Sequence, residues 1–182
     1  MTAEPKGEYL QMEIERKFLI TQLPDDLDDY PFLTITQAYL CTNPVVRIRR
    51  QDDEYYLTYK GGGMMVREEY NLPLNKEAFA HLLAKADGNI ISKKRYLIPI
   101  SNPAFRDGYT PKENLALKIE LDIFEPPFVP LILAEVEFPD EETAGAFIPP
   151  AWLCEDVTDN AQYHNSNMSR RQISTHAPLS AE

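Results

Sequence analysis

Acidic residues recur in couplets, with one residue between the two carboxylates, in three separate parts of the chain. Neighbouring carboxylates supply the oxygen ligands that Mg²⁺ and Mn²⁺ prefer in proteins. The spacing predicts a site for a divalent cation if the three segments meet in the folded protein. The three couplets are Glu13 and Glu15, Glu120 and Asp122, and Glu135 and Glu137.

Basic residues show the same alternating spacing in other segments. Arginine offers a planar fork that matches phosphate oxygens, and lysine adds a compact point charge. Acidic and basic couplets within one enclosure indicate a metal-bound polyanion, and a polyphosphate is the simplest candidate. The basic residues concerned are Lys17, Arg47, Arg49, Lys60, Arg67, Lys93 and Arg95.

These residues can act together only if their segments are β-strands, because side chains two positions apart lie on one face of a strand. In each segment the intervening positions are mostly apolar. A mainly antiparallel sheet of about eight strands can close into a barrel whose lumen is lined by one face. The predicted strands are residues 11–20, 33–40, 45–50, 55–60, 65–73, 90–100, 115–124 and 131–138.

Two arrangements of such a sheet are possible. In the first, the apolar face is inside and the charges lie in solvent, as in an ordinary soluble sheet. The expected helices, residues 75–86 with Asn75 as N-cap and residues 140–147, offer little apolar surface to cover an outward apolar face. Packing therefore favours charges outside, whereas the preference for arginine and for paired carboxylates favours a charged lumen.

Composition limits the class of protein. A chain of 182 residues with a formal net charge of −11 suits one domain, and general affinity for nucleic acid is not expected. Two cysteines in no metal-ligand spacing suit a reducing compartment, and no apolar run is long enough to span a membrane. We expect one cytoplasmic domain over residues 1–182, with a flexible leader at residues 1–10 and a flexible tail at residues 176–182.

The segment Glu13-Ile14-Glu15-Arg16-Lys17 resembles the Glu-x-Glu-x-Lys signature of the CYTH domain, or triphosphate tunnel metalloenzyme, family. The resemblance extends from residue 13 to about residue 165 and follows the order of the family's motifs. It implies an eight-stranded antiparallel tunnel with charged residues inside and helices packed outside. Further matching blocks are residues 46–49, 57–60, 67–70, 93–96, 119–122, 134–137 and 155–158.

The resemblance also implies roles for the residues. Acidic couplets would bind Mg²⁺ or Mn²⁺, and basic residues would clamp the phosphates. Lys17 is the catalytic candidate, as a base or an orienter of water; a phosphate contact or an ion pair is the alternative. The implied metal ligands are Glu13, Glu15, Glu135 and Glu137, with Glu120 and Asp122 as further acidic candidates. The implied clamp is Arg47, Arg49, Lys60, Lys93 and Arg95, with Arg67 as an additional candidate.

Within the family, the short chain is most similar to compact bacterial members that hydrolyse inorganic tripolyphosphate to pyrophosphate and orthophosphate. Three alternatives stay open: a class IV adenylate cyclase, a thiamine triphosphatase and a non-catalytic polyphosphate-binding module. The expected partner is a small molecule that contains a triphosphate. No nucleic acid or membrane partner is expected, and the protein is expected to be a monomer or a homodimer.

Overall fold

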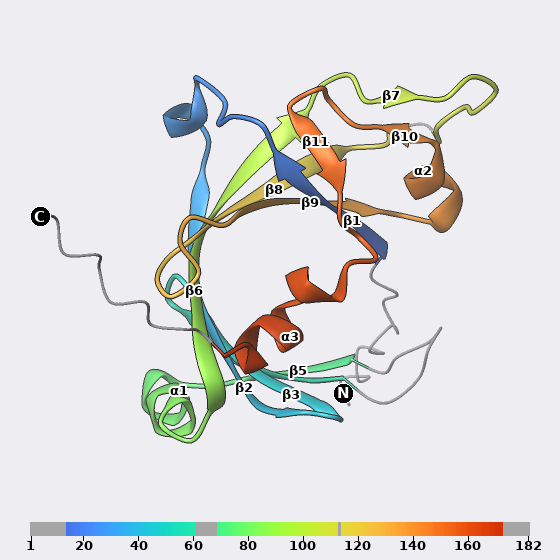
Figure 1. Ribbon diagram of the computed structural model, residues 1–182. Helices are drawn as coiled ribbons and strands as arrows, with labels where there is room; N and C mark the ends of the chain where they lie inside the picture. Colours follow the sequence, from blue (N-terminus) through green and yellow to red (C-terminus); the bar gives the residue numbers. More distant parts are fainter. Residues whose placement is uncertain (1–13, 61–68, 113, 173–182) are drawn as a thin grey trace, which may run out of the picture.

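The computed structural model describes residues 14–60, 69–112 and 114–172, which form one large curved sheet with short helices around it (Figure 1). The sheet has the strand order β11-β1-β9-β8-β6-β2-β3-β4-β5, and all neighbouring strands are antiparallel. A small second sheet pairs β7 (Ala104–Phe105) with β10 (Phe147–Ile148). The strands of the large sheet are β1 (Ile14–Ile20), β2 (Phe32–Thr42), β3 (Val45–Gln51), β4 (Glu54–Lys60), β5 (Glu69–Pro73), β6 (Asp87–Ile100), β8 (Leu117–Phe124), β9 (Ile132–Phe138) and β11 (Leu153–Asp156).

The helices are short, and α1 (Lys76–Leu83) begins after Asn75, the capping residue that the sequence predicts. The Oδ1 atom of Asn75 accepts a hydrogen bond from the backbone amide of Ala78 at 2.7 Å, and Asp140 caps the next α-helix in the same way. None of the described helices is both long and apolar enough to cross a membrane. The helices are α1 (Lys76–Leu83), α2 (Glu141–Ala146), α3 (Asn165–Arg170) and the 3₁₀ turns η1 (Leu27–Asp29) and η2 (Ala161–Tyr163).

The prediction of an eight-stranded closed barrel is correct in its antiparallel β-character but wrong in its strand count. The ninth strand, β11, pairs with β1 through Phe18 and Asp156. It has only four residues, too few to show an alternating pattern in the sequence. The sheet has two edges, β11 and β5, and no strand pairing among the described residues joins them.

Several predicted features lie outside the described residues. These are the leader at residues 1–10, the tail at residues 176–182, the metal-ligand candidate Glu13 and the clamp candidate Arg67.

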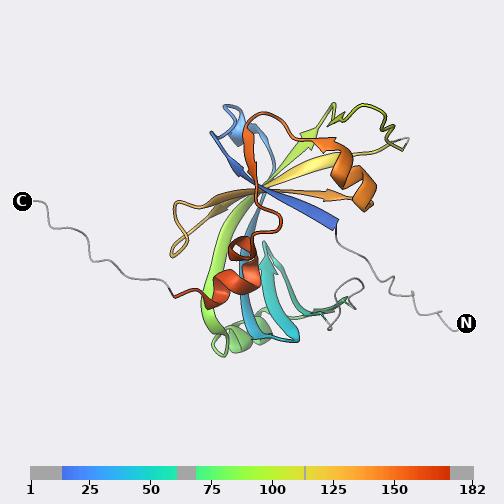
Figure 2. The same ribbon diagram turned by 45° about the vertical axis from the view of Figure 1, so that its right-hand side comes forward.

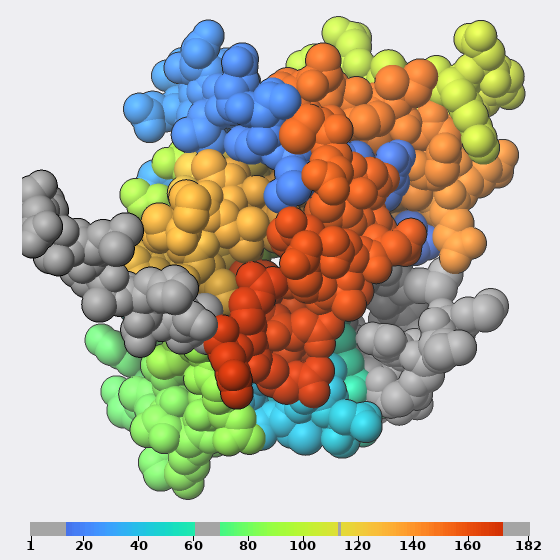
Figure 3. All heavy atoms as spheres, in the orientation of Figure 1, coloured from blue at the N-terminus to red at the C-terminus, as the bar shows by residue number. Residues whose placement is uncertain are grey.

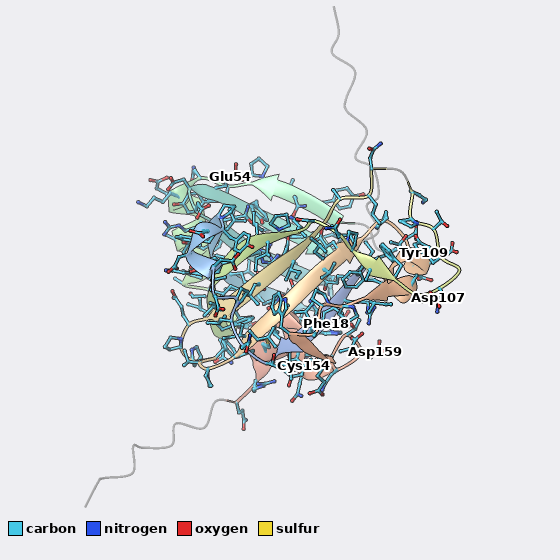
Figure 4. The ribbon with its side chains drawn as sticks, turned by 90° about the horizontal axis from the view of Figure 1, so that it is seen from above. Phe18, Glu54, Asp107, Tyr109, Cys154 and Asp159 are labelled. Carbon is cyan, nitrogen blue, oxygen red and sulfur yellow. The ribbon has the colours of Figure 1, made fainter. Side chains whose placement is uncertain are left out.

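The sheet curls around a central space. In Figure 1, β1, β8 and β9 lie above while β3 and β5 lie below, and the 14-residue strand β6 runs between the two groups. The same two groups are separated in the view of Figure 2. Seen from above in Figure 4, Glu54 at the start of β4 and Cys154 of β11 lie on opposite sides of the molecule. Because the sheet is curled, side chains from strands that are distant in the sheet face one interior.

The outer face of the sheet is apolar and is covered by the small elements. Ile119, Leu121 and Val136 are buried there in a cluster that includes Phe147 of β10 and Ala144 of α2. On the lower strands, Phe79 of α1 covers a second cluster. Burial of each large aliphatic or aromatic side chain stabilises the fold by about 1.5–3 kcal/mol. The helices α1 and α2 and the β7–β10 pair thus cover the outward apolar face, so the expectation from packing that the charges lie outside is wrong.

The inner face changes from charged to apolar along each of three neighbouring strands, β6, β8 and β9. Ile91, Phe124 and Leu133 are buried together with Met168 of α3. These residues form an apolar floor beneath the charged part of the interior. The next inward-facing positions along the same strands are Lys93, Asp122 and Glu135.

Gly88, near the start of β6, permits the close approach of α3. Its φ is +78°, and a Cβ atom there would lie 2.1 Å from the carbonyl oxygen of Ser169. We expect Gly88→Ala to lower the free energy of unfolding by about 3 kcal/mol or more, because the left-handed backbone and the collision both oppose a side chain. Urea unfolding at neutral pH measures this change.

Two other glycines separate the effect of the left-handed backbone from the effect of the collision with Ser169. Gly108 also has a positive φ, +85°, but a Cβ there would meet nothing within 4 Å, so Gly108→Ala should cost about 1 kcal/mol. Gly145 lies in α2, also with open space, and Gly145→Ala should stabilise the protein by up to about 1 kcal/mol. A Gly88→Ala variant no less stable than Gly108→Ala would contradict the close packing of α3 on β6.

Candidate functional site

A cavity of about 1230 Å³ lies on the inner face of the curled sheet. Its walls come from strands at both ends of the sheet, including Glu15 of β1 and Asn71 of β5, and from the beginning of α3. The cavity brings together most of the residues that the sequence predicts. The predicted cations that line it are Lys17, Arg47, Arg49, Lys60 and Arg95, and the predicted acids are Glu15, Glu120, Glu135 and Glu137.

Arg95 of β6 is the centre of the charged network. Its Nε and Nη2 atoms donate to the two carboxylate oxygens of Asp122, both at 2.7 Å, and Nη2 also donates to Glu135 at 2.5 Å. Nη1 donates to Glu120. One guanidinium therefore contacts three carboxylates from β8 and β9, which would be costly to bury unpaired. Three lysines each add a further positive charge to one of these carboxylates: Lys17, Lys93 and Lys118.

Lys17 of β1 faces Glu135 in the strand register and forms an ion pair with it. Its Nζ atom also lies 2.6 Å from Glu15. Burial alone would lower the pKa of Lys17, but the two carboxylates outweigh it and raise the pKa above its ordinary value. Lys17 is therefore held as a cation, which favours the ion-pair alternative over a role as base.

Glu135 is buried between cations. Burial would raise the pKa of Glu135, but Arg95, Lys93 and Lys17 outweigh it and hold the pKa well below the usual range. The carboxylate is thus ionised at neutral pH and can serve as an oxygen ligand without losing a proton.

Two predicted site residues lie beneath the cavity and do not line it. Lys93 and Asp122 are at most 1% exposed and form an ion pair with each other. Burial and the nearby Arg95 lower the pKa of Lys93 to about 8, although Asp122 acts in the opposite direction. Asp122 pairs with both Lys93 and Arg95, so the two residues help to hold Arg95 in place. The assignment of Lys93 to the phosphate clamp and of Asp122 to the metal site stays a prediction.

Two arginines of β3, Arg47 and Arg49, donate hydrogen bonds to neutral side chains. The Oε1 atom of Gln37 accepts hydrogen bonds from Nε and Nη2 of Arg49, at 3.0 and 2.7 Å. The Nη2 atom of Arg47 donates to the hydroxyl of Thr58 at 3.1 Å, and this hydroxyl donates to Asn71. Thr58 therefore links Arg47 to Asn71 by hydrogen bonds.

Two further residues at this site were not predicted from the sequence. Gln37 occupies an inward-facing position between Ile35 and Tyr39, where a polar side chain interrupts an apolar alternation. This interruption is the feature of the sequence from which Gln37 could have been predicted. His164 lines the cavity at the start of α3, and its lack of a ligand-spaced partner left no signal in the sequence.

The acidic residues offer the right donor type for a divalent cation. Glu15 faces Glu137 across β1 and β9, and Glu120 faces Glu135 across β8 and β9. Carboxylate oxygens suit Mg²⁺ and Mn²⁺. In the described part of the chain, no three acidic, histidine or cysteine side chains already stand close enough to hold a metal. The donor chemistry fits, and metal binding requires carboxylates such as Glu120, now paired with Arg95 and Lys118, to exchange these partners.

Through residues 156–158, the C-terminal segment forms hydrogen bonds with β1, the strand that carries Lys17. Val157 donates its backbone amide to the carbonyl of Lys17 at 2.8 Å, and the amide of Lys17 donates to the hydroxyl of Thr158. Asp156 accepts from Thr158 and from Arg16, the latter through Nε at 2.9 Å and Nη2 at 2.7 Å. In Figure 3 this segment, orange to red, runs down the face of the molecule between the upper and lower strands.

Comparison with known proteins identifies the family. Residues 11–126 match the CYTH domain, and an inorganic triphosphatase of Nitrosomonas europaea is 37% identical over 161 residues, 86% of this chain and 96% of that protein. The chain belongs to the CYTH domain family. An inorganic triphosphatase of Acetivibrio thermocellus is 30% identical over 167 residues, 86% of this chain and 92% of that protein.

Structural comparison agrees with the CYTH assignment. A crystal structure of an inorganic triphosphatase matches this chain with a TM-score of 0.64 and 32% identity, over 91% of this chain and 99% of that one. Triphosphate-hydrolysing CYTH enzymes are metal-dependent, in agreement with the carboxylate-lined cavity. The resemblance carried by the signature at Glu15 and Lys17 is thereby confirmed at the level of the family.

The network at Asp156 predicts a pH-dependent contribution to stability. Partial burial would raise the pKa of Asp156, but hydrogen bonds from Thr158 and Arg16 outweigh it and lower the pKa. A lowered pKa in the folded state stabilises the protein above the unfolded value of about 3.9, and this contribution is lost as pH falls through the folded value. Asp156→Asn should cost about 0.5–1 kcal/mol at pH 7, a value reduced for the solvent exposure of the pair.

Urea unfolding at several pH values between 7 and 3 tests this expectation. The difference between wild type and Asp156→Asn should shrink below about pH 4, where the unfolded carboxyl takes up its proton. Asp159→Asn is the control, since Asp159 is exposed on the nearby surface loop (Figure 4). A difference that stays constant across this range would contradict the contribution of the Asp156 charge.

Proposed function

We propose that this CYTH protein hydrolyses inorganic tripolyphosphate to pyrophosphate and orthophosphate with a divalent cation. One observation carries the proposal: a single cavity presents Arg47, Arg49 and Lys60 together with two facing pairs of glutamates. Relatives at 37% and 30% identity that are named inorganic triphosphatases support the reaction class. In the reaction, water attacks a terminal phosphorus and the bond to the bridging oxygen breaks, which releases pyrophosphate.

The basic side of the cavity would bind the phosphates. Arg47 and Arg49 project from adjacent inward positions of β3, and Lys60 projects from the neighbouring strand β4. Arginine forks match the oxygens of a phosphate group, and fixed positive charges stabilise the charge that develops during phosphoryl transfer. Because the arginine side chains are already hydrogen-bonded within the protein, they need little reorganisation when the anion binds.

The acidic side would hold Mg²⁺ or Mn²⁺. Glu15 and Glu137 at the cavity, with Glu120, Glu135 and the predicted ligand Glu13, are the residues that would bind it. Such an ion neutralises phosphate charge and lowers the pKa of bound water.

Lys17, kept protonated by its carboxylate neighbours, would act as a cation. Its contacts with Glu15 and Glu135 hold both carboxylates on the cavity side of β1 and β9. This role needs no loss of a proton from the ammonium group, in agreement with its raised pKa.

We also propose that the sheet encloses the substrate as a tunnel. Support comes from the cavity walls, which include β1, next to the edge strand β11, and β5, the opposite edge strand. A polyanion in this position would be surrounded by fixed charges and shielded from bulk water. Electrostatic interactions are stronger in such a shielded site than in water.

For the whole chain we propose one cytoplasmic domain that acts on a small molecule as a monomer or homodimer. Both Cys41 and Cys154 are free thiols, which suits a reducing compartment. The net charge of −11 disfavours association with nucleic acid.

A product assay tests the function. Purified protein with Mg²⁺ or Mn²⁺ should release orthophosphate and pyrophosphate from tripolyphosphate, much faster than it turns over ATP or thiamine triphosphate, and excess chelator should abolish turnover. Glu137→Ala should lower kcat/KM about 100-fold, because one oxygen ligand of the proposed metal site is lost. Glu155→Ala is a matched control on β11, where the side chain is exposed and does not line the cavity.

Other outcomes would change the proposal in defined ways. Cyclic AMP formed from ATP would assign the protein to adenylate cyclases, and faster hydrolysis of thiamine triphosphate would change the substrate. Tight binding of tripolyphosphate without turnover would indicate a binding module. Full activity of Glu137→Ala would show that the metal-site assignment is wrong.

A further inference from the structure

Gln37 of β2 lies directly opposite Arg49 of β3 in the strand register. Its side chain is completely buried, and its Oε1 atom accepts two hydrogen bonds from Arg49, from Nε at 3.0 Å and from Nη2 at 2.7 Å. Two bonds to one oxygen fix both the position and the plane of the guanidinium group. The Nη1 atom contacts the hydroxyl of Tyr56 at 3.4 Å, so one edge of the group is only weakly engaged.

Arg49 differs in this respect from the other deeply placed cations. Arg95, Lys17 and Lys93 are each paired with carboxylates. The side-chain hydrogen-bond partners of Arg49 among the described residues, Gln37 and Tyr56, are both neutral. Arg49 is therefore oriented by the protein while its positive charge is not cancelled by a direct partner.

Packing does not explain a glutamine at this position. The Nε2 atom of Gln37 is buried and has no hydrogen-bond partner in the described part of the protein. A buried donor without a partner lowers stability, and methionine of similar size would fill the same space without that cost. Glutamate would also offer an oxygen to Arg49, but it would bring a negative charge beside the cavity. Glutamine combines the acceptor with neutrality.

We propose that Gln37 is a positioning residue that orients Arg49 toward a phosphate group and leaves its charge available for the anion. This inference rests on the proposed triphosphate function and specifies how one cation of that site is prepared. Gln37 does not line the cavity and acts through Arg49.

Kinetics with tripolyphosphate and Mg²⁺ on two variants test the proposal. Gln37→Met removes the acceptor and should raise KM about tenfold, the effect of losing charge-assisted hydrogen bonds that hold Arg49, with kcat nearly unchanged. Gln37→Glu keeps an oxygen in place but adds a charge, and should raise KM further. A wild-type KM for Gln37→Met would overturn the orienting role, and a wild-type KM for Gln37→Glu would overturn the importance of neutrality.

A double-mutant cycle with Arg49→Met shows whether Gln37 acts through Arg49. In the Arg49→Met background, Gln37→Met should have no further effect on KM, because the group that it positions is absent. An equal loss in both backgrounds would overturn the proposal. The unfolding midpoint is a separate readout: Gln37→Met removes an unpartnered donor, but it also removes the acceptor of two hydrogen bonds from Arg49, so the two effects on stability oppose each other. A fall in the midpoint of Gln37→Met together with a wild-type KM would indicate a purely structural role.

Two further measurements make the test specific. Gln51→Glu places the same new charge at another position of the cavity wall, and it measures the general electrostatic effect, which should be smaller than that of Gln37→Glu. The rise of the unfolding midpoint with added tripolyphosphate in the presence of chelator gives a binding readout independent of turnover. It should be smaller in both Gln37 variants. If wild type neither binds nor hydrolyses tripolyphosphate, the proposed function fails; if wild type does both, the variants decide the role of Gln37.

Discussion

The compensation of buried charge by Arg95 is the interaction on which the interior of this protein depends. The guanidinium contacts Glu120, Asp122 and Glu135 from two neighbouring strands, and Lys93 completes the pairing of Asp122 from below. Without these contacts, a sheet that turns its carboxylates inward would bury uncompensated charge, which strongly destabilises a fold. With them, the charged face can form the interior while α1, α2 and β10 cover the apolar face.

The cavity consequently has two chemically different sides. On β1, β6, β8 and β9, cationic side chains and carboxylates are in direct contact. A carboxylate of this kind can exchange its cationic partner for a divalent metal ion. On β3, the Arg49 side chain is held by the neutral groups of Gln37 and Tyr56, and the adjacent Arg47 donates to Thr58. A metal–triphosphate complex carries both signs of charge, so under the proposed function the acidic side would complement the metal and the basic side the phosphates.

The last part of the chain also contributes to this interior, although α3 is not part of the sheet. Met168 of α3 packs on the apolar floor, and Asp156 and Thr158 fasten the backbone of β1 where Lys17 is located. Close approach of α3 depends on the absence of a side chain at Gly88. Segments far apart in sequence thus determine the position of individual charged groups at the cavity.

The sequence by itself determined what depends on neighbouring residues: the alternation that places Glu135 and Glu137 on one strand face, the cap at Asn75, and the family signature at Glu15 and Lys17. Alternation has the same period whichever face is buried, so only tertiary packing decided that the charges point inward. Tertiary structure also added β11 as a ninth strand, placed Lys93 and Asp122 below the cavity, and set Gln37 against Arg49. These features depend on register between strands, because cross-strand neighbours are distant in sequence.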